Sequence, residues 1–408
     1  MSYVENVNTR RQDTGEGDAF GRLRVSEVNS QLDLKQLHDP LPLFYDTFTD
    51  GNATITHSEI EARSQLATTS ASGIAIIQTK QRGNYSSGKS QQIFMTFNNF
   101  DQETNVTKRV GYFTHLSSAA GYDTSLDGLW LESTSDGISI NVYKTGVESE
   151  RTLQSNWNID TLDGNGPSGV DFGDFSTNFI FLIDFEWLGL GRIRWGTVHQ
   201  GNIIYFHESN FTNETGGVYM STPNHPLRAE MRQSGAGSGT FNYVCATVGS
   251  EGAINKLGRI LSDNLGTTHV NANATSNKYA LLGIRLQSAK ADTLVDLLDF
   301  SVLATTQDNQ LVEVWLNPTV AGTFTYSNVT NSSVQTAKGA ANGSNTVTGG
   351  TLLFSTYVSQ QTATPFVIEN TIRLGMNIDY TVDEIVLTTN PLTSNSRVLG
   401  AISWRELA

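Results

Sequence analysis

The sequence predicts an all-β protein with an extended N-terminal arm, a body like a concanavalin-type jelly roll or β-sandwich, and a second, smaller C-terminal β-sandwich. Short runs with period-two alternation recur between turns rich in Gly, Asn, Asp and Ser, and no long amphipathic helical pattern interrupts them. Glycine is abundant, with 37 residues, and only 16% of residues are charged, which is typical of many turns and polar uncharged surfaces. The expected divisions are the arm at 1–44, the body at 45–252, a connection at 253–276 and the C-terminal β-sandwich at 277–408.

The arm at 1–44 is polar and weakly periodic, and its most patterned piece is GDAFGRLRVS at 17–26. A short helix is expected around 31–37. An arm of this composition has too little apolar surface to build a core of its own, so it is expected to lie on a neighbouring subunit or on another protein. An unattached tail is the alternative. The residues expected to dock are Phe20, Arg22, Leu23, Arg24 and Val25.

The stretch 179–208 organises the body, because it alternates like three consecutive antiparallel strands. In its first strand, Asp184 and Glu186 share one face and large apolar side chains occupy the other. A connecting bend of odd length sets Asp184 opposite Arg194. The same bend sets Glu186 opposite Arg192, whereas an even bend would place the carboxylates opposite apolar residues. These four charged side chains are therefore expected to form a charge ladder on the solvent side of the sheet.

Two later connections also lead to predictions. The dipeptide Gln200–Gly201 has the length and the glycine of a two-residue hairpin turn, and it predicts that Trp195 lies opposite Phe206. The tract 327–350 consists almost entirely of Ser, Thr, Asn, Gly, Ala and Val. This composition predicts a long exposed hairpin or loop.

Composition argues against several classes of partner. The formal net charge of −14 repels a phosphate backbone and no Lys/Arg cluster offsets it, so no nucleic-acid partner is expected. No apolar run approaches the roughly 20 residues of a membrane-spanning helix, so no membrane insertion is expected. The N-terminus lacks the hydrophobic stretch of a signal peptide, which predicts synthesis in a cytoplasm without export by that route. The single cysteine, Cys245, has no intrachain partner, so packing or oligomerisation must supply stability.

Asp184 and Glu186 are the candidate pair for glycoside hydrolysis, since some glycosidases built on jelly rolls use a Glu-x-Asp-x-Glu strand. The first position of that pattern is Leu182 here, so the nucleophile of a retaining mechanism is missing. Arg192 and Arg194 are expected to hold both carboxylates ionised, which is the wrong state for a general acid. No nucleophile elbow, phosphate loop or nucleotide fingerprint occurs either. The chain is therefore expected not to be an enzyme, and a polysaccharide depolymerase remains as a third hypothesis.

A Gly-rich loop at 156–175 is the candidate metal site. Asp160, Asp163 and Asn165 supply oxygen atoms of the kind that calcium prefers. They match no complete EF-hand spacing, and Asp-Gly turns explain the same composition. The seven histidines are scattered, which argues against zinc. No cofactor is expected, and calcium at this loop stays open as the alternative.

Eight motifs follow one another along the first part of the chain: GDAFGRLRVS, PLFYDTF, GKSQQIFMTFNNF, TKRVGYF, LDGNGPSG, FLIDFEWLGLGRIRWG, VYMSTPN and VCATVGSEG. In this order they resemble an uncharacterised family of virion structural proteins of tailed phages, notably marine phages, with relatives in large DNA viruses. The resemblance covers about 17–252 and does not extend to 253–408. It implies a non-enzymatic component of the particle, such as a capsid-attached fibre, a decoration protein or a tail-associated protein.

Two compatible functions are therefore expected ahead of the depolymerase. The first is a structural protein of the virion, docked by its arm to capsid, portal or tail components and displayed as a fibre, spike or decoration. A symmetric mount predicts a homo-oligomer, with a trimer expected for fibres and spikes. The second is a lectin-like module that binds host-surface glycan. The aromatic residues that could stack on sugar rings, or instead build the core, are Trp130, Tyr143, Trp157 and Tyr219.

Overall fold

The computed structural model describes residues 17–24, 27–115, 125–188, 190–212, 216–252, 257–290, 292–306, 308–359, 364–393 and 395–407. Within these ranges the chain is all-β, as predicted, with 26 strands and two short 3-10 helices, η1 (Gln154–Asn156) and η2 (Ser288–Lys290). None of the helices in these ranges is long and apolar enough to cross a membrane. The chain divides into two compact units: unit 1 is Met1–Thr79 with Gly83–Asn255, and unit 2 is Lys80–Arg82 with Lys256–Ala408.

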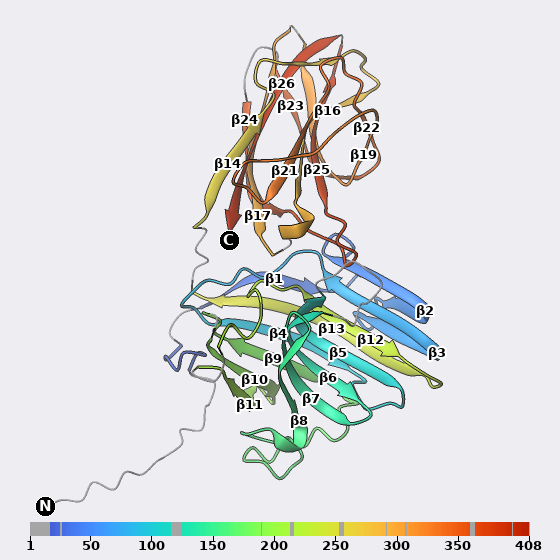
Figure 1. Ribbon diagram of the computed structural model, residues 1–408. Coiled ribbons are helices and arrows are strands. Elements are labelled where there is room, and N and C mark those ends of the chain that lie inside the picture. The colour runs from blue at the N-terminus through green and yellow to red at the C-terminus, as the bar shows by residue number, and fades with distance from the viewer. Residues whose placement is uncertain are drawn as a thin grey trace, which may run out of the picture. The chain divides into compact units, whose positions relative to one another are not determined.

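Unit 1 contains β1 (Val28–Lys35), β2 (Tyr45–Ser58), β3 (Arg63–Thr79), β4 (Gln91–Asn98), β5 (Val106–His115), β6 (Leu126–Thr134), β7 (Gly137–Lys144), β8 (Val147–Leu153), β9 (Phe179–Phe185), β10 (Arg192–His199), β11 (Asn202–Asn210), β12 (Leu227–Gln233) and β13 (Gly239–Glu251). They form one curled sheet in the order β11-β10-β9-β4-β13-β3-β12-β5-β6-β7-β8 (Figure 1). β1 pairs with β13, and β2 pairs with β3.

The period-two alternation of the strands builds the core of unit 1. Phe181, Ile183 and Phe185 of β9 point inward and are fully buried. Val110 and Tyr112 of β5, near the other end of the sheet, belong to the same core. The rings of Tyr112 and Phe185 lie 5.8 Å apart between centroids. Two halves of one curled sheet therefore enclose a single apolar layer, as a jelly-roll-like sandwich requires.

The hairpin between β9 and β10 has the register that its odd bend predicted. Asp184 lies opposite Arg194, and Phe185 lies opposite Ile193. The inward residues of both strands therefore meet in the core, while the charged residues share the outer face of the sheet.

The next hairpin, between β10 and β11, differs from its prediction in one respect. Gln200 and Gly201 form the turn, with φ of 49° and 81°, as a two-residue connection requires. A β-bulge after Trp195 then shifts the pairing, so that Trp195 lies opposite His207 and not Phe206. The predicted Trp195–Phe206 pair was wrong because an extra residue in one strand leaves no mark in the alternation on either side of it.

The segment before β2 also differs from the prediction. Residues 31–37 were expected to form a short helix, but most of them belong to β1, which pairs antiparallel with β13. Leu32 and Leu34 are buried, which is the period of a strand and not of a helix. This part of the expected arm at 1–44 is therefore an integral strand of unit 1.

Unit 2 contains β14 (Arg259–Asn264), β15 (Val270–Ala272), β16 (Lys278–Leu286), β17 (Leu294–Ala304), β18 (Gln310–Leu316), β19 (Thr319–Val320), β20 (Ser327–Asn328), β21 (Val334–Lys338), β22 (Thr346–Thr348), β23 (Thr351–Val358), β24 (Thr364–Arg373), β25 (Glu384–Pro391) and β26 (Ser396–Leu407). One sheet has the order β14-β26-β17-β24, with β15 on β26, and the other has the order β19-β22-β16-β25-β18-β23, with β21 on β16 and β20 on β21 (Figure 1). Phe300, Leu387 and Trp404 belong to the core that both sheets share.

Two stretches that were expected to be weakly patterned are strands. β14 and β15 lie inside the expected connection at 253–276, and both pair with β26. Within the tract 327–350, which was expected to be a long exposed hairpin or loop, β20 and β21 do pair antiparallel, but β21 also pairs with β16 and buries Val334 and Ala337. β14, β15 and β21 have three to six residues and include Asn, Asp, Ser or Thr, so no run of alternation is long enough to mark them in the sequence.

Candidate functional site

Residues 17–24, which we name the latch, form a tight turn. The Asp18 carboxylate accepts hydrogen bonds from the backbone N–H of Arg22 at 2.7 Å and from its Nε at 2.7 Å. The N–H of Gly21 donates to the Asp18 carbonyl at 2.9 Å, and the φ of 76° at Gly21 is the conformation that glycine adopts at little cost. The Asp18 side chain is buried, so the turn is folded around this carboxylate.

Two arginines of β10 hold the latch by its backbone. Arg194 Nη2 donates to the carbonyl oxygen of Gly17 at 2.6 Å. Arg192 Nε donates to the carbonyl oxygen of Ala19 at 2.8 Å. Because the acceptors are backbone carbonyls, these two hydrogen bonds depend on the backbone conformation of the turn more than on its side chains.

Beneath the latch, Asp184 is fully buried and accepts four hydrogen bonds. The donors are the guanidiniums of Arg24 and Arg194, the hydroxyl of Ser90 and the hydroxyl of Tyr205, the last at 2.8 Å. Burial, and then the negative charge of Asp184, raises the pKa of Tyr205, which keeps that hydroxyl a donor. The carboxylate is therefore fully engaged by the protein itself.

Arg24 of the latch also binds Glu251 at the end of β13, with Nε 2.8 Å from Oε1. Burial disfavours the charged form of Arg24, but the negative charges of Asp184 and Glu251 outweigh burial and raise its pKa. Burial raises the pKa of Glu251 despite the attraction of Arg24. The latch thus joins the first part of unit 1 to its last strand.

The predicted charge ladder takes a different form in the structure. Asp184 does pair with Arg194, but the pair is buried under the latch and not exposed to solvent. Arg192 pairs with Glu208 at 3.0 Å, and it is the backbone N–H of Arg192 that donates to Glu186, at 3.1 Å. Burial raises the pKa of Glu186, which is opposite to the expectation that the arginines favour its ionised form.

Three of the residues expected to dock the arm on a partner, Phe20, Arg22 and Arg24, have contacts within the chain. Arg24 binds Asp184, and the guanidinium of Arg22 lies 4.5 Å from the centroid of the Phe20 ring. Leu23 is 66% exposed, and Val25 lies outside the described residues. Ion pairs and backbone hydrogen bonds hold the latch on its own unit, and docking on a partner stays a prediction.

Arg24→Ala is expected to lower the free energy of unfolding of unit 1 by about 1.5–3 kcal/mol, because it removes a hydrogen bond to a buried charged group. Arg63→Ala is the control, since Arg63 of the same unit pairs with Glu61, whose side chain is 53% exposed. The control is expected to cost about 1 kcal/mol or less. Denaturant unfolding followed by tryptophan fluorescence measures both, and equal losses would contradict the role of Arg24.

The oxygens proposed for calcium are used by their own loop. Asp160 accepts the N–H groups of Leu162 at 2.8 Å and Ser168 at 2.7 Å. Asp163 accepts the N–H of Asn165 at 3.0 Å. Nowhere in the described ranges do three or more His, Cys, Asp or Glu side chains gather as metal ligands. The arrangement is that of Asx turns, in which the side chain satisfies the backbone two residues on.

A buried charge network on β12, β5 and β6 was not recognised in the sequence. Glu230 accepts from Arg109 Nη1 at 2.7 Å and from Arg228 Nε at 2.8 Å, and Arg109 Nε donates to Glu132 at 2.7 Å. Burial raises the pKa of Glu230, but the guanidiniums of Arg228 and Arg109 lower it by more, so the net shift of the pKa is downward. The available signal was the alternation Arg-Ala-Glu-Met-Arg at 228–232, which places three charges on one strand face.

The aromatic residues considered as a sugar-stacking platform mostly build the interior. Trp130, Trp157 and Tyr219 are buried. Tyr143 is partly exposed, but its ring packs 4.8 Å from that of Trp130 and its hydroxyl donates to Glu148. The sequence left open whether these four side chains stack on sugars or build the core, and the core role holds for Trp130, Trp157 and Tyr219.

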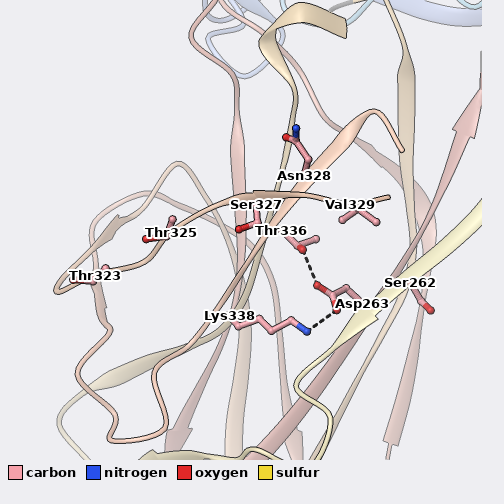
Figure 2. Close-up of a pocket in the computed structure, with 9 residues that line it drawn as sticks. All are labelled: Ser262, Asp263, Thr323, Thr325, Ser327, Asn328, Val329, Thr336 and Lys338. Atoms are coloured by element: carbon pink, nitrogen blue, oxygen red, sulfur yellow. Dashed lines mark hydrogen bonds and ion pairs between the residues drawn. The ribbon is translucent and has the colours of Figure 1, made fainter. Parts of the chain in front are cut away.

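Unit 2 contains a polar hollow with a volume of about 580 Å³ (Figure 2). Its walls come from β14, from the segment 323–329 that includes β20, and from β21. Eight of its nine lining residues are polar, and the exception is Val329. The lining consists of Ser262, Asp263, Thr323, Thr325, Ser327, Asn328, Val329, Thr336 and Lys338.

Asp263 is the centre of the polar groups in the hollow. Lys338 Nζ lies 2.9 Å from its Oδ1, and the Thr336 hydroxyl donates to its Oδ2 at 2.6 Å (Figure 2). Burial raises the pKa of Asp263, but the bonds from Thr336 and Lys338 outweigh burial and lower it, so the carboxylate stays an acceptor. Asn328 accepts from Gln335 Nε2 at 2.9 Å, which fixes the orientation of its amide. Asp263 and Thr336 are 73 residues apart in the sequence, and sequence reasoning therefore missed this site.

No family model matches the sequence, and no curated protein matches it either. Among solved structures, the legume lectin-like domain from Entamoeba histolytica matches 55% of this chain and 98% of its own length, with 13% identity and a TM-score of 0.36. The Bacillus licheniformis beta-glucanase matches 54% and 97%, with 11% identity and a TM-score of 0.34. A protein of unknown function with a galectin-like fold from Bacillus subtilis matches 56% and 100%, with 8% identity and a TM-score of 0.35. The similarity is one of fold class alone.

Proposed function

We propose that this chain is a non-enzymatic carbohydrate-binding protein and that the hollow of unit 2 is its binding site. The observation behind this proposal is the lining, in which hydroxyl, amide, carboxylate and ammonium groups converge with one apolar side chain. Sugar hydroxyls donate and accept hydrogen bonds, and they need partners of both kinds within a small volume. The ionised Asp263 supplies the acceptor, and Lys338 and Asn328 supply donors.

Two arrangements support a role without catalysis. Asp184, the carboxylate in the glycosidase-like strand, is buried and occupied by four donors of its own chain, so a substrate has no access to it. Glycosidases of both stereochemical classes use a pair of carboxyl groups on either side of the scissile bond. The described lining of the hollow offers one, Asp263.

We further propose that the protein is a structural component of a tailed-phage virion. Four of the motifs that resemble this family supply residues of the latch cluster, which are Arg24, Ser90, Asp184, Arg194 and Glu251, with Asp184 and Arg194 in the same motif. A shared structural role in this cluster gives a reason for these motifs to occur in one chain, and it requires no catalytic residue among them. The partners would be capsid, portal or tail components and further copies of this chain in a homotrimer, and the hollow would bind host-surface glycan.

A glycan array that includes host polysaccharide tests the binding proposal with the full-length chain, biotinylated and tetramerised on streptavidin. The chain is expected to bind, and Asp263→Asn and Asn328→Ala are each expected to weaken binding at least 10-fold, because each removes a hydrogen-bonding group of the lining. Asp379→Asn is the matched control, since it changes an exposed carboxylate of unit 2 outside the lining. Unchanged binding by both lining variants, or no binding by the chain, contradicts the proposal.

A further inference from the structure

We infer that the ligand of the hollow is an uncharged oligosaccharide, held by hydrogen bonds without ring stacking, so that one copy binds weakly and attachment depends on several copies acting together. This inference rests on the proposed carbohydrate-binding function and specifies its ligand class and its valency.

The charges of the hollow favour an uncharged ligand. Its two charged groups, Asp263 and Lys338, lie 2.9 Å apart and neutralise each other, and the other lining residues are Ser, Thr, Asn and Val. The described lining therefore has no net charge to attract a uronic acid, a sialic acid or a sulfated sugar. The whole chain has a formal net charge of −14, which repels acidic glycans at longer range.

A row of hydroxyl groups lines one side of the hollow. Thr323, Thr325 and Ser327 alternate with Phe324 and Tyr326, and only the three hydroxyl residues belong to the lining (Figure 2). Both aromatic side chains are partly buried and pack against other residues of the protein. Phe324 packs against a small core cluster and the Tyr326 ring lies 4.1 Å from the Arg285 guanidinium. The row can donate and accept along an extended sugar chain.

Because the alternation turns Phe324 and Tyr326 away, the described lining has no aromatic ring on which a sugar could stack. Stacking on an aromatic face buries apolar surface of a sugar, whereas a hydrogen bond to a sugar replaces one that the sugar already makes with water. A site that depends on exchanged hydrogen bonds is expected to bind its ligand with a Kd of about 1 mM for a single copy. Joining several copies raises the effective affinity by about 10²–10⁴ without any new contact.

The experiment compares the full-length chain as separate molecules with the same chain biotinylated and tetramerised on streptavidin, on an array of neutral and acidic glycans at 50 and 500 mM NaCl. We expect the tetramer to bind neutral glycans at least 100-fold more tightly than separate chains, with less than a twofold effect of salt. Asp263→Asn, which leaves Lys338 as a net positive charge, is expected to weaken neutral binding and to increase the share of acidic glycans bound at 50 mM NaCl.

Each other outcome overturns a specific statement. Preference of the unmodified tetramer for acidic glycans, with binding that falls at least 10-fold in 500 mM NaCl, overturns the uncharged ligand but leaves carbohydrate binding in place. Micromolar binding by separate chains overturns the dependence on several copies. Binding of neutral glycans that Asp263→Asn and Asn328→Ala both leave unchanged overturns the hollow as their site. No binding of the tetramer to any glycan on the array overturns the proposed function itself.

Discussion

Asp184→Asn is expected to lower the free energy of unfolding of unit 1 by about 3–5 kcal/mol, the range measured when one partner of a buried ion pair is removed. The side chain is fully buried, and its carboxylate faces the guanidiniums of Arg24 and Arg194. Asparagine keeps the shape but removes the negative charge, so the buried Arg194 loses the carboxylate with which it pairs, and Arg24 is left with Glu251 as its anionic partner. Denaturant unfolding followed by tryptophan fluorescence gives the difference.

The control for this variant is Glu208→Gln. Glu208 pairs with Arg192 on the neighbouring strand at 3.0 Å, but both side chains are partly exposed. Water screens this pair, and its loss is expected to cost about 1 kcal/mol or less. If the two variants lose the same stability, the cluster under the latch has no special role in holding unit 1 together.

Glu230→Gln is the second substitution with a large expected effect, again about 3–5 kcal/mol. Glu230 is buried between Arg109 and Arg228, with distances of 2.7 Å and 2.6 Å to their nitrogens. Glutamine leaves two guanidiniums of the interior without their shared anion. Glu384→Gln in unit 2, whose pair with Arg285 has the same 2.7 Å distance but is about 30% exposed on both sides, is the control and is expected to cost about 1 kcal/mol or less.

The same variant predicts a specific pH dependence. The pKa of Glu230 is lowered in the folded state, so its contribution is fully present above the unfolded value of about 4.3 and is lost as the pH falls through the folded value. The gap in stability between the unmodified chain and Glu230→Gln is therefore expected to be constant from pH 6 to 8. It should shrink below about pH 4. A gap that stays unchanged at pH 3 contradicts the assignment.

The sequence supported prediction where a local pattern decides the structure. The register of Asp184 and Arg194 followed from the parity of one bend, because an even bend would have buried charges against apolar side chains. The all-β class followed from recurring alternation and turn residues. Both arguments use residues that are close in sequence, and both describe what the structure contains.

The sequence did not support prediction where distant segments meet. The burial of Asp184 depends on Arg24, which is 160 residues away, and no local pattern shows that a turn will cover a strand face. The hollow of unit 2 joins Asp263 to Thr336, 73 residues further along. The shift after Trp195 depends on one extra residue in a strand. Contacts of this kind follow from the tertiary fold and not from periodicity.

Synthesis on the ribosome imposes an order on the folding of unit 1, because its first strand pairs with its last. β1 needs β13 as a neighbour, and Arg24 needs Glu251, which is translated 227 residues later. At about 5–20 residues per second, the beginning of the unit waits roughly 10–45 s for its partner. Throughout that interval the leucines of β1 stay exposed on the nascent chain, so this strand is the segment that chaperones of the translating cell are expected to bind first.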